Sequence, residues 1–416
     1  MFELAGPLFH LIDLFAIAGG GGSSSSGGGG GSFSGGGSSS GGGSDSPWSF
    51  VIFLIIFLGI WFFTYLVARK AAKVLKARRA KIKADLAQAA AADIIWKANS
   101  IEAHAKDTFI QYQKDWSVFD LDSMKQYMTP GYYQHNLLMM GALKLHARQN
   151  DVRNPVVNSA EVVEFTDNDD DTKDTHTVQL NVHVFDVLND TRENKQLFAQ
   201  YLATTEYYKF VRSGSTWKFA GIDQATAQPS KRNVPLEAFA KKNGYFYSLD
   251  WGHLLIPKRG QLFRYGTFGV SDINNHVIGL YKDIIVQLYT YAQVPGANVE
   301  YLIAQTSVPK SYGNIVVRNK SGVYSPKVKK LRKLKMEWQD FNKKYEVFAS
   351  DENLATSFEL LHPTFMEQLE ALPFEVSIEV VDNIVYLYTS GYGLTKSENY
   401  ETMLTILKAA FKEMRM

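Results

Sequence analysis

The stretch VQLNVHVF (178–185) alternates apolar and polar residues with a period of two. Because successive side chains of a strand point to opposite faces, this period predicts a half-buried β-strand. Two further strands are predicted at 198–211 and 217–222 from their β-branched and aromatic residues. Residues 85–150, which precede them, carry apolar residues at helical spacing. Helices followed by long strands indicate an α+β arrangement for residues 85–226.

The C-terminal part also mixes strand and helix patterns. Residues 267–318 contain apolar β-branched and aromatic runs separated by turn residues, which predict strands. Residues 351–372 predict two helices broken at a proline, and a hairpin followed by a last amphipathic helix closes the chain. A second α+β domain is therefore expected over 240–416, after a linker at 227–239.

Composition and charge exclude several classes of protein. The chain has 44 basic and 42 acidic residues and no cysteine. Without cysteine there is no disulfide scaffold, thiolate zinc site, iron–sulfur cluster or cysteine nucleophile. Residues 1–68 contain no Lys or Arg, whereas 69–83 contain eight and no acid. This uneven distribution, over a nearly neutral total, is not typical of a DNA-binding protein.

A long uncharged stretch predicts a membrane segment. Residues 48–68 contain 21 residues without a charge, and as a helix they would reach roughly 31 Å, the thickness of a bilayer core. Because the basic residues all follow this stretch, the positive-inside rule places the N-terminus outside and the C-terminal domains in the cytoplasm. The expected location is therefore a bacterial cytoplasmic membrane, with a single pass.

Two segments precede this stretch. Residues 19–47 are almost entirely Gly and Ser and predict a flexible linker. Residues 1–18 are apolar and end in a small-residue pattern, but they lack a positive start. They are interpreted either as a cleaved signal peptide or as a short interfacial or disordered segment.

The basic juxtamembrane segment 69–84 is expected to contact anionic lipid head groups. The alternatives are a simple stop-transfer flank and, for its later half, contact with ribosomal RNA. Its basic residues are Arg69, Lys70, Lys73, Lys76, Arg78, Arg79, Lys81 and Lys83.

A second basic run lies near residue 330. Apolar residues recur beneath it at helical spacing from Val328 to Phe341, which predicts an amphipathic helix. Its basic face is interpreted either as an ordinary solvated face or as a surface for anionic lipid or RNA. The basic residues are Lys327, Lys329, Lys330, Arg332, Lys333 and Lys335.

Two segments of the first domain carry a family resemblance. FIQYQKDWSVFDLDSMKQYMTPGYYQ (109–134) and EYYKFVRSGSTWKFAGID (206–223) resemble the Tim-forty-four-like domain family over about 85–226. That family includes the membrane anchor of the mitochondrial import motor, mitoribosomal membrane receptors and bacterial homologues. The positions that match its motif, also read as core-packing residues, are Trp116, Asp120, Leu121, Tyr127, Tyr132, Tyr207, Phe210 and Trp217.

The resemblance implies an NTF2-like cone, with helices on a curved antiparallel sheet, an apolar pocket and docking at a membrane. It implies tethering or recruitment rather than catalysis. The N-terminal chaperone-binding region of the import anchor is absent, which puts binding of such a chaperone in doubt. Residues 240–415 resemble an uncharacterised bacterial domain family, and this second resemblance implies no chemistry.

Catalytic and metal patterns fail on inspection. The S-x-x-K match at 307–310 contains a proline and has no K-T-G partner. The acidic run 167–171 lacks the Gly and Glu of a calcium loop and is interpreted as a solvated turn. His176 and His183 are an odd number of residues apart, so they face opposite ways and cannot share a metal. The polar stretch SDINNH (271–276) predicts a turn.

The function expected from these patterns is a single-span membrane tether or scaffold whose domains serve protein translocation or assembly. It is not expected to be an enzyme or to carry a cofactor or metal. The expected partners are anionic lipid head groups, a protein or peptide client and, as a further candidate, the ribosome, but no specific DNA. The alternatives are a lipid-sensing or envelope module that uses both basic runs, or an enzyme whose conical pocket uses His183 and Glu206.

Overall fold

The computed structural model describes residues 47–222, 233–252, 254–255, 260–263, 273–291, 300–308, 310–321, 327–350, 361–371, 375–391 and 393–413. The predicted segment 1–18, nearly all of the Gly/Ser-rich segment 19–47 and half of the linker at 227–239 lie outside them. The chain divides into two compact units. Unit 1 comprises Met1–Phe109, Val156–His183 and Leu202–Ser230, and unit 2 comprises Ile110–Pro155, Val184–Tyr201 and Lys231–Met416. The domain boundaries expected from the sequence stay predictions.

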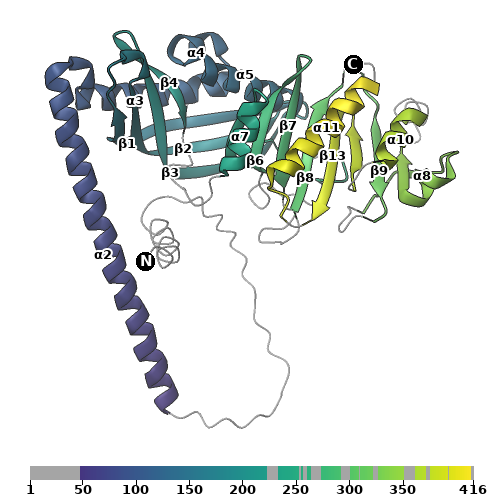
Figure 1. The fold of residues 1–416 in the computed structure, drawn as a ribbon, viewed down its shortest axis with the longest axis horizontal. Coiled ribbons are helices and arrows are strands. Elements are labelled where there is room, and N and C mark those ends of the chain that lie inside the picture. Colours follow the sequence, from purple (N-terminus) through teal and green to yellow (C-terminus); the bar gives the residue numbers. More distant parts are fainter. Residues whose placement is uncertain are drawn as a thin grey trace. The chain divides into compact units, whose positions relative to one another are not determined.

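The predicted α+β class is confirmed, because the chain contains two β-sheets together with helices (Figure 1). The NTF2-like, cone-like form expected for residues 85–226 stays a prediction.

Helix α2 is continuous from Pro47 to Ala92. The side chains of residues 48–57 lie outside the described residues. Within the part that the structure describes, no helix is long and apolar enough to cross a membrane. The transmembrane helix expected at 48–68, and the single-pass cytoplasmic-membrane topology derived from it, are therefore wrong.

The helices predicted within residues 85–150 are confirmed. Asp120 caps the helix that begins at Leu121 by accepting a hydrogen bond from the Ser123 backbone N–H (2.9 Å). Thr129 caps the next helix, which begins at Pro130. Both are common N-terminal signals, because a side-chain oxygen satisfies a free N–H and proline has none to satisfy. The elements are η1 (Ile94–Trp96), α3 (Ala98–Val118), α4 (Leu121–Tyr127) and α5 (Pro130–Leu145).

Sheet A has four strands in sequential order, separated after the first by the short helix η2 (Asp171–Lys173). The three predicted strands are present, and Val178, Leu180 and Val182 are buried on one face of β2 as their spacing predicts. The first strand was not predicted, because its burial does not alternate and it contains Pro155. The strands are β1 (Arg148–Thr166), β2 (Thr175–Asp190), β3 (Lys195–Ser213) and β4 (Thr216–Ile222).

Within the described residues, sheet B has nine strands in the order β10-β11-β9-β12-β13-β8-β7-β6-β5. Every adjacent pair is antiparallel. The predicted hairpin at Asp382-Asn383 is confirmed, since Val381 pairs with Ile384. The strands are β5 (Phe246–Gly252), β6 (Ile273–Tyr281), β7 (Ile284–Tyr291), β8 (Glu300–Ser307), β9 (Asn314–Asn319), β10 (Arg332–Leu334), β11 (Tyr345–Ala349), β12 (Ser377–Val381) and β13 (Ile384–Gly391).

Strand β6 corrects the polar turn expected at 271–276. The chain is extended from Ile273 onward, with a shift of register between Asn274 and Val277. Asn275 has a positive φ of 52°, and this irregularity lets β6 contain one extra residue while the strand stays paired in the sheet. His276 is consequently buried, 2.9 Å from Gln287 Oε1.

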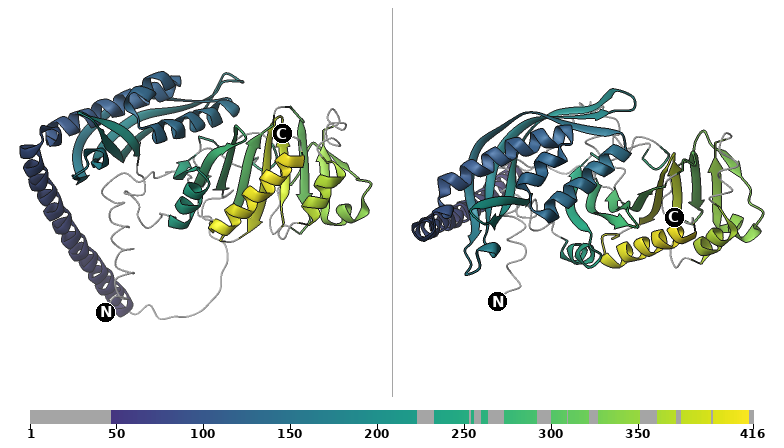
Figure 2. Two further views of the ribbon diagram at one scale, coloured as in Figure 1. Left: turned by 45° about the horizontal axis from the view of Figure 1, so that its top comes forward. Right: turned by 90° about the horizontal axis from the view of Figure 1, so that it is seen from above.

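Helices cover one face of sheet B (Figure 2). Their apolar residues form the main core with the inward residues of β7, β8, β9, β12 and β13. The closing helix is confirmed, with Tyr400, Met403, Leu404 and Leu407 buried as its spacing predicts, whereas residues 351–360 of the predicted helix pair lie outside the described residues. The helices are α7 (Val234–Lys242), α8 (Gln339–Lys344), α10 (Pro363–Glu370) and α11 (Ser397–Glu413).

The amphipathic helix expected between Val328 and Phe341 is wrong. Lys330 has a φ of 61°, which a right-handed helix cannot contain, and residues 332–334 form strand β10. The backbone N–H and C=O groups of β10 are hydrogen-bonded to β11, whereas in a helix they would be hydrogen-bonded within the helix. Only α8, after Trp338, is helical in this region.

Candidate functional site

His176 of unit 1 lies in a cluster of aromatic rings. It stacks on Phe210 (4.8 Å between centroids), and its edge meets Trp217 (4.4 Å). Burial lowers the pKa of His176 to about 3, so the ring is neutral at pH 7. Neither ring nitrogen has a hydrogen-bond partner among the described residues. Two of the family-motif residues, Phe210 and Trp217, therefore act here as packing residues.

The two residues considered for acid–base chemistry do not come together. His183 faces away from His176, and its Nδ1 lies 3.2 Å from Asn158 Nδ2. Glu206 lies on the same face of β3 as buried Tyr208, and burial raises the pKa of its carboxyl to about 7. Because these side chains occupy opposite faces of sheet A, they cannot act on one substrate as a pair.

The acidic run 167–171 contributes to a structural ion-pair cluster. Arg212 contacts Asp93 (2.8 Å), Asp171 (2.9 Å) and fully buried Asp174 (3.1 Å). Asp174 also accepts a hydrogen bond from the Asn168 backbone N–H (2.7 Å). The described residues contain no group of three side chains that could hold a metal ion.

The other family-motif residues belong to different local structures. Trp116 donates its indole N–H to Asn150 (2.9 Å), and Tyr127 donates its hydroxyl to buried Asp115 (3.1 Å). Leu121 begins α4 after the capping Asp120, and Tyr132 lies near Tyr112, 6.4 Å between ring centroids. Tyr207 lies on β3, with its hydroxyl 3.5 Å from Gln179. The motif residues are thus divided between the two units.

The eight basic residues of α2 are exposed along the helix. Arg79 is bound within unit 1, because it pairs with Glu161 (2.9 Å) and donates to Gln179 (3.3 Å). Contact of these residues with anionic head groups stays a prediction.

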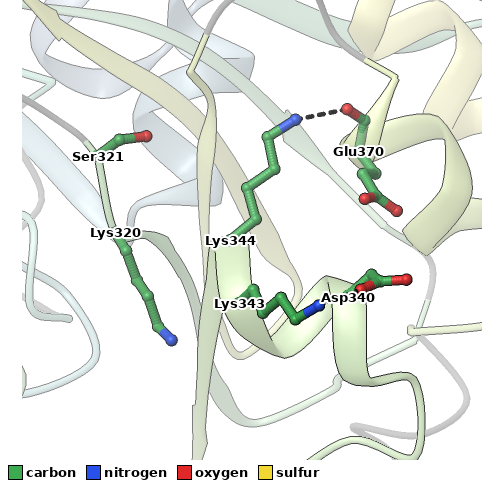
Figure 3. Close-up of a pocket in the computed structure, with 6 residues that line it drawn as sticks. All are labelled: Lys320, Ser321, Asp340, Lys343, Lys344 and Glu370. Atoms are coloured by element: carbon green, nitrogen blue, oxygen red, sulfur yellow. Dashed lines mark hydrogen bonds and ion pairs between the residues drawn. The ribbon is translucent and has the colours of Figure 1, made fainter.

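A cleft of about 480 Å³ lies in unit 2 where β9 ends, beside α8 and the end of α10 (Figure 3). Its framework is held by buried hydrogen bonds. The Asn319 side chain accepts from the Ser321 backbone N–H (2.9 Å) and hydroxyl (2.7 Å), which sets the turn after β9. The Tyr345 hydroxyl donates to the Leu369 carbonyl (2.9 Å), which fixes the last turn of α10.

Asn342 holds the start of α8. Its side-chain amide donates to the carbonyls of Met336 (2.6 Å) and Trp338 (2.8 Å), and its Oδ1 accepts from the Met336 backbone N–H (3.0 Å). The fully buried ring of Phe341 stacks on Tyr345 at 4.8 Å. The short helix that carries Lys343 and Lys344 is therefore anchored to the core.

Three ammonium groups and two carboxylates line this cleft. Lys343 pairs with Asp340 (2.8 Å), and that pairing raises the pKa of Lys343. Lys344 donates to the Glu370 carbonyl and Lys320 to the Asn342 carbonyl, both at 2.6 Å (Figure 3 shows the first of these). A neutral carbonyl leaves an ammonium its full charge and two further N–H donors, so Lys320 and Lys344 can bind an anion.

The second basic run forms an exposed surface on and around β10, here named the cationic edge. Lys333 pairs with Glu346 (2.7 Å), which Arg318 also contacts, and these two cations lower the pKa of Glu346 to about 2. Residues 314–349 contain ten Lys or Arg against three acids. Among the described residues, four lysines of the cationic edge have no acidic partner: Lys327, Lys329, Lys330 and Lys335.

Lys320, Lys343 and Lys344 were not predicted as site residues. Lys320 is more than twenty residues from the other two, and no sequence spacing connects them. The pairing of β11 with β9 joins them, since Tyr345 is opposite Asn319. The adjacent pair Lys343-Lys344, directly before a strand, was the one sequence feature that could have indicated a binding site here.

Comparison with known proteins identifies a family for part of unit 2. Residues 302–392 match the model of a family described as "Protein of unknown function (DUF3137)". This match includes the cleft and the cationic edge but covers less than a quarter of the chain. It confirms, in coarse form, the expectation of an uncharacterised domain near the C-terminus. The Tim-forty-four-like resemblance has no support from these comparisons and stays a prediction.

No curated protein matches the chain. Among solved structures, the mycobacterial trehalose monomycolate transport factor A, TtfA, is similar over 43% of this chain and 93% of its own, at 12% identity and a TM-score of 0.34. The intermembrane space region of the chloroplast protein ARC6 is similar over 29% of this chain and 93% of its own, at 14% identity and a TM-score of 0.24.

Proposed function

We propose that this chain is a non-catalytic binding protein that holds an extended, acidic polypeptide segment along strand β10. The observation that carries the proposal is the cationic edge, where four exposed lysines have no acidic partner among the described residues. This proposal retains the protein or peptide client expected from the sequence and leaves out the membrane anchor.

An extended segment fits because β10 is the last strand at its end of sheet B within the described residues. The outer side of such a strand presents N–H and C=O groups that another strand can pair with. Lysines beside an edge disfavour pairing between two copies of the same edge, because the like charges repel. The same lysines attract a segment rich in Asp or Glu, so the edge selects its partner by charge.

Lipid and RNA fit this surface less well. An amphipathic segment that lies in a membrane surface combines charge with apolar side chains that enter the bilayer, yet Met336 and Phe341 are buried in the core. Binding to single-stranded RNA uses exposed aromatic rings for stacking, but Trp338 is half-buried and stacks on Phe341. The apolar residues of this run are thus committed to the protein interior, and the charges remain outside.

Reversing the four unpaired charges should abolish most of the binding. The variant combines Lys327→Glu, Lys329→Glu, Lys330→Glu and Lys335→Glu, and the probe is a fluorescent eight-residue peptide of alternating Glu and Thr. Four lost attractions and four new repulsions, at about 0.4 kcal/mol each, should lower its affinity about two hundredfold by fluorescence anisotropy at low salt. Raising the salt to about 0.3 M should weaken binding to the unmodified protein as well.

The matched control reverses four exposed lysines of α2, through Lys70→Glu, Lys73→Glu, Lys76→Glu and Lys81→Glu. It changes the net charge equally and should bind the peptide nearly as the unmodified chain does. Equal losses in both variants would show a non-specific charge effect and contradict the proposal. Phosphatidylglycerol vesicles and oligouridylate serve as competing probes, and binding of either one, but not of the peptide, through the edge would also contradict it.

A further inference from the structure

We infer that the segment held along β10 places an apolar residue opposite Leu334 and, directly after it, an acidic residue opposite Lys333. This inference rests on the proposed function, because the segment is the one that pairs with the outer side of β10. It assigns the sequence pattern that this strand recognises, which attraction between opposite charges alone does not specify.

The two faces of β10 differ in chemistry. Leu334 is paired with Val347 of β11, and Lys333 is paired with Phe348. Because successive side chains of a strand point to opposite faces, Leu334 and Val347 share one face and Lys333 and Phe348 share the other. Val347 belongs to the main core, and Leu334 packs against that core. The face with Leu334 is therefore apolar, and the face with Lys333 is charged.

An apolar row of side chains crosses the sheet and ends at Leu334. Its members lie opposite one another on five neighbouring strands: Leu387, Ile378, Val317, Val347 and Leu334. The first four are buried, whereas Leu334 is half-buried, because within the described residues no strand lies beyond β10. An apolar side chain on an added strand would continue the row and shield Leu334 from water.

A row of alternating charge ends at Lys333 on the other face. Arg318 of β9 is opposite Glu346 of β11, with its Nε 3.2 Å from one carboxylate oxygen, and the Lys333 ammonium lies 2.7 Å from the other. The Lys333 side chain is 59% exposed, and its bond to Glu346 uses one of three N–H donors. An acidic residue on the added strand would continue the order positive, negative, positive with a negative charge.

The order of the two residues follows from the direction of the strands. The paired strands of sheet B are antiparallel throughout the described residues. A strand added in the same pattern runs opposite to β10, so its residue opposite Leu334 comes directly before its residue opposite Lys333. The recognised step is therefore an apolar residue followed at once by an acidic one.

The test compares two acetylated and amidated peptides of the same composition. One alternates Glu and Val and has Thr at each end, so that each Val is followed by Glu. The other follows each Val by Thr, so that Glu recurs at every third position and the charge stays evenly spread. The unmodified protein should bind the first about fourfold more tightly by fluorescence anisotropy, because an antiparallel segment of the second can make only one of the two contacts.

Substitutions at the ends of the two rows should remove this preference. Leu334→Thr and Lys333→Met should each bring the two affinities within about 1.5-fold, because either variant leaves one contact that both peptides can make. Lys333→Met leaves Glu346 paired with Arg318. Leu334→Ile keeps an apolar side chain and should keep the preference. So should the matched control Leu280→Thr, at a leucine of β6 that is 41% exposed.

The inference and the proposed function fail separately. Equal affinity of the two peptides for the unmodified protein would overturn the inference, as would a preference that survives both Leu334→Thr and Lys333→Met. If the two affinities are equal and reversal of the four unpaired lysines of the cationic edge abolishes both, the pattern is wrong and the binding function stands. If that reversal leaves peptide binding unchanged, the proposed function itself is wrong.

Discussion

Replacing Arg212 by methionine should destabilise unit 1 by about 3–5 kcal/mol, the range found when one partner of a buried ion pair is removed. The Arg212 side chain is 11% exposed and Asp174 is fully buried. The cation is the counter-charge of Asp174, and the variant leaves a buried carboxylate with only neutral hydrogen bonds, from the Asn168 backbone N–H (2.7 Å) and side-chain amide (3.5 Å). Burial of an uncompensated charge is among the costliest changes that a single substitution produces.

Urea unfolding followed by tryptophan fluorescence measures this loss, because Trp96 and Trp217 contact each other within unit 1. The matched control is Arg79→Met, which removes a pair with Glu161 whose side chains are 43% and 42% exposed. That variant should lose less than about 1 kcal/mol. Adding Asp174→Asn to the Arg212 variant should recover part of the stability, and equal losses for the two arginine variants would contradict the prediction.

Acidification from pH 7 to pH 4 should lower the free energy of unfolding by about 6 kcal/mol in total. Burial lowers the pKa of His135, His146 and His176 to about 3 and that of His276 to about 4. These rings stay neutral in the folded protein but bind protons near pH 6.5 when it unfolds. Stability is therefore lost as the pH falls below 6.5, by about 3 kcal/mol for each ring at pH 4, at 1.36 kcal/mol per pH unit.

Two buried carboxyl groups act in the opposite direction. Burial raises the pKa of Glu206 and of Glu379 to about 7, although Glu379 accepts a hydrogen bond from the Leu262 backbone N–H (2.7 Å). The folded protein binds these protons first, so each group adds stability as the pH falls from 7 towards 4.5, by about 3 kcal/mol. Four histidines against two carboxyl groups leave a net loss, and that loss should develop below about pH 6.

Variants on one strand separate these contributions. His176→Leu should reduce the acid-induced loss by about 3 kcal/mol, because the titrating ring is gone. His183→Leu changes the same residue type on the opposite, half-buried face of β2 and is the matched control for the loss of a histidine. Urea unfolding at pH 7 and pH 4 measures the free energy of unfolding of both variants. If the His176 variant lost as much stability between pH 7 and pH 4 as the unmodified protein, the low pKa of His176 would be contradicted.

The sequence by itself determined the local structure wherever a pattern depends on neighbours in the chain. The alternation at Val178–Val182, the cap at Asp120 and the hairpin at Asp382-Asn383 were all predictable, because burial on one face, capping and turn formation involve residues only a few positions apart. It also determined where the positive charges lie along the chain.

Tertiary structure decided the rest. Residues 328–341 have helical spacing, yet pairing with β11 and the left-handed backbone of Lys330 make part of them a strand. The Lys320 backbone N–H donates to the Lys344 carbonyl (2.9 Å) because β9 and β11 are neighbours in the sheet, a contact that no local pattern encodes. The physical reason is the same in both cases. A backbone or ammonium group forms its hydrogen bond with a group that folding brings close in space, and that group is far away in the sequence.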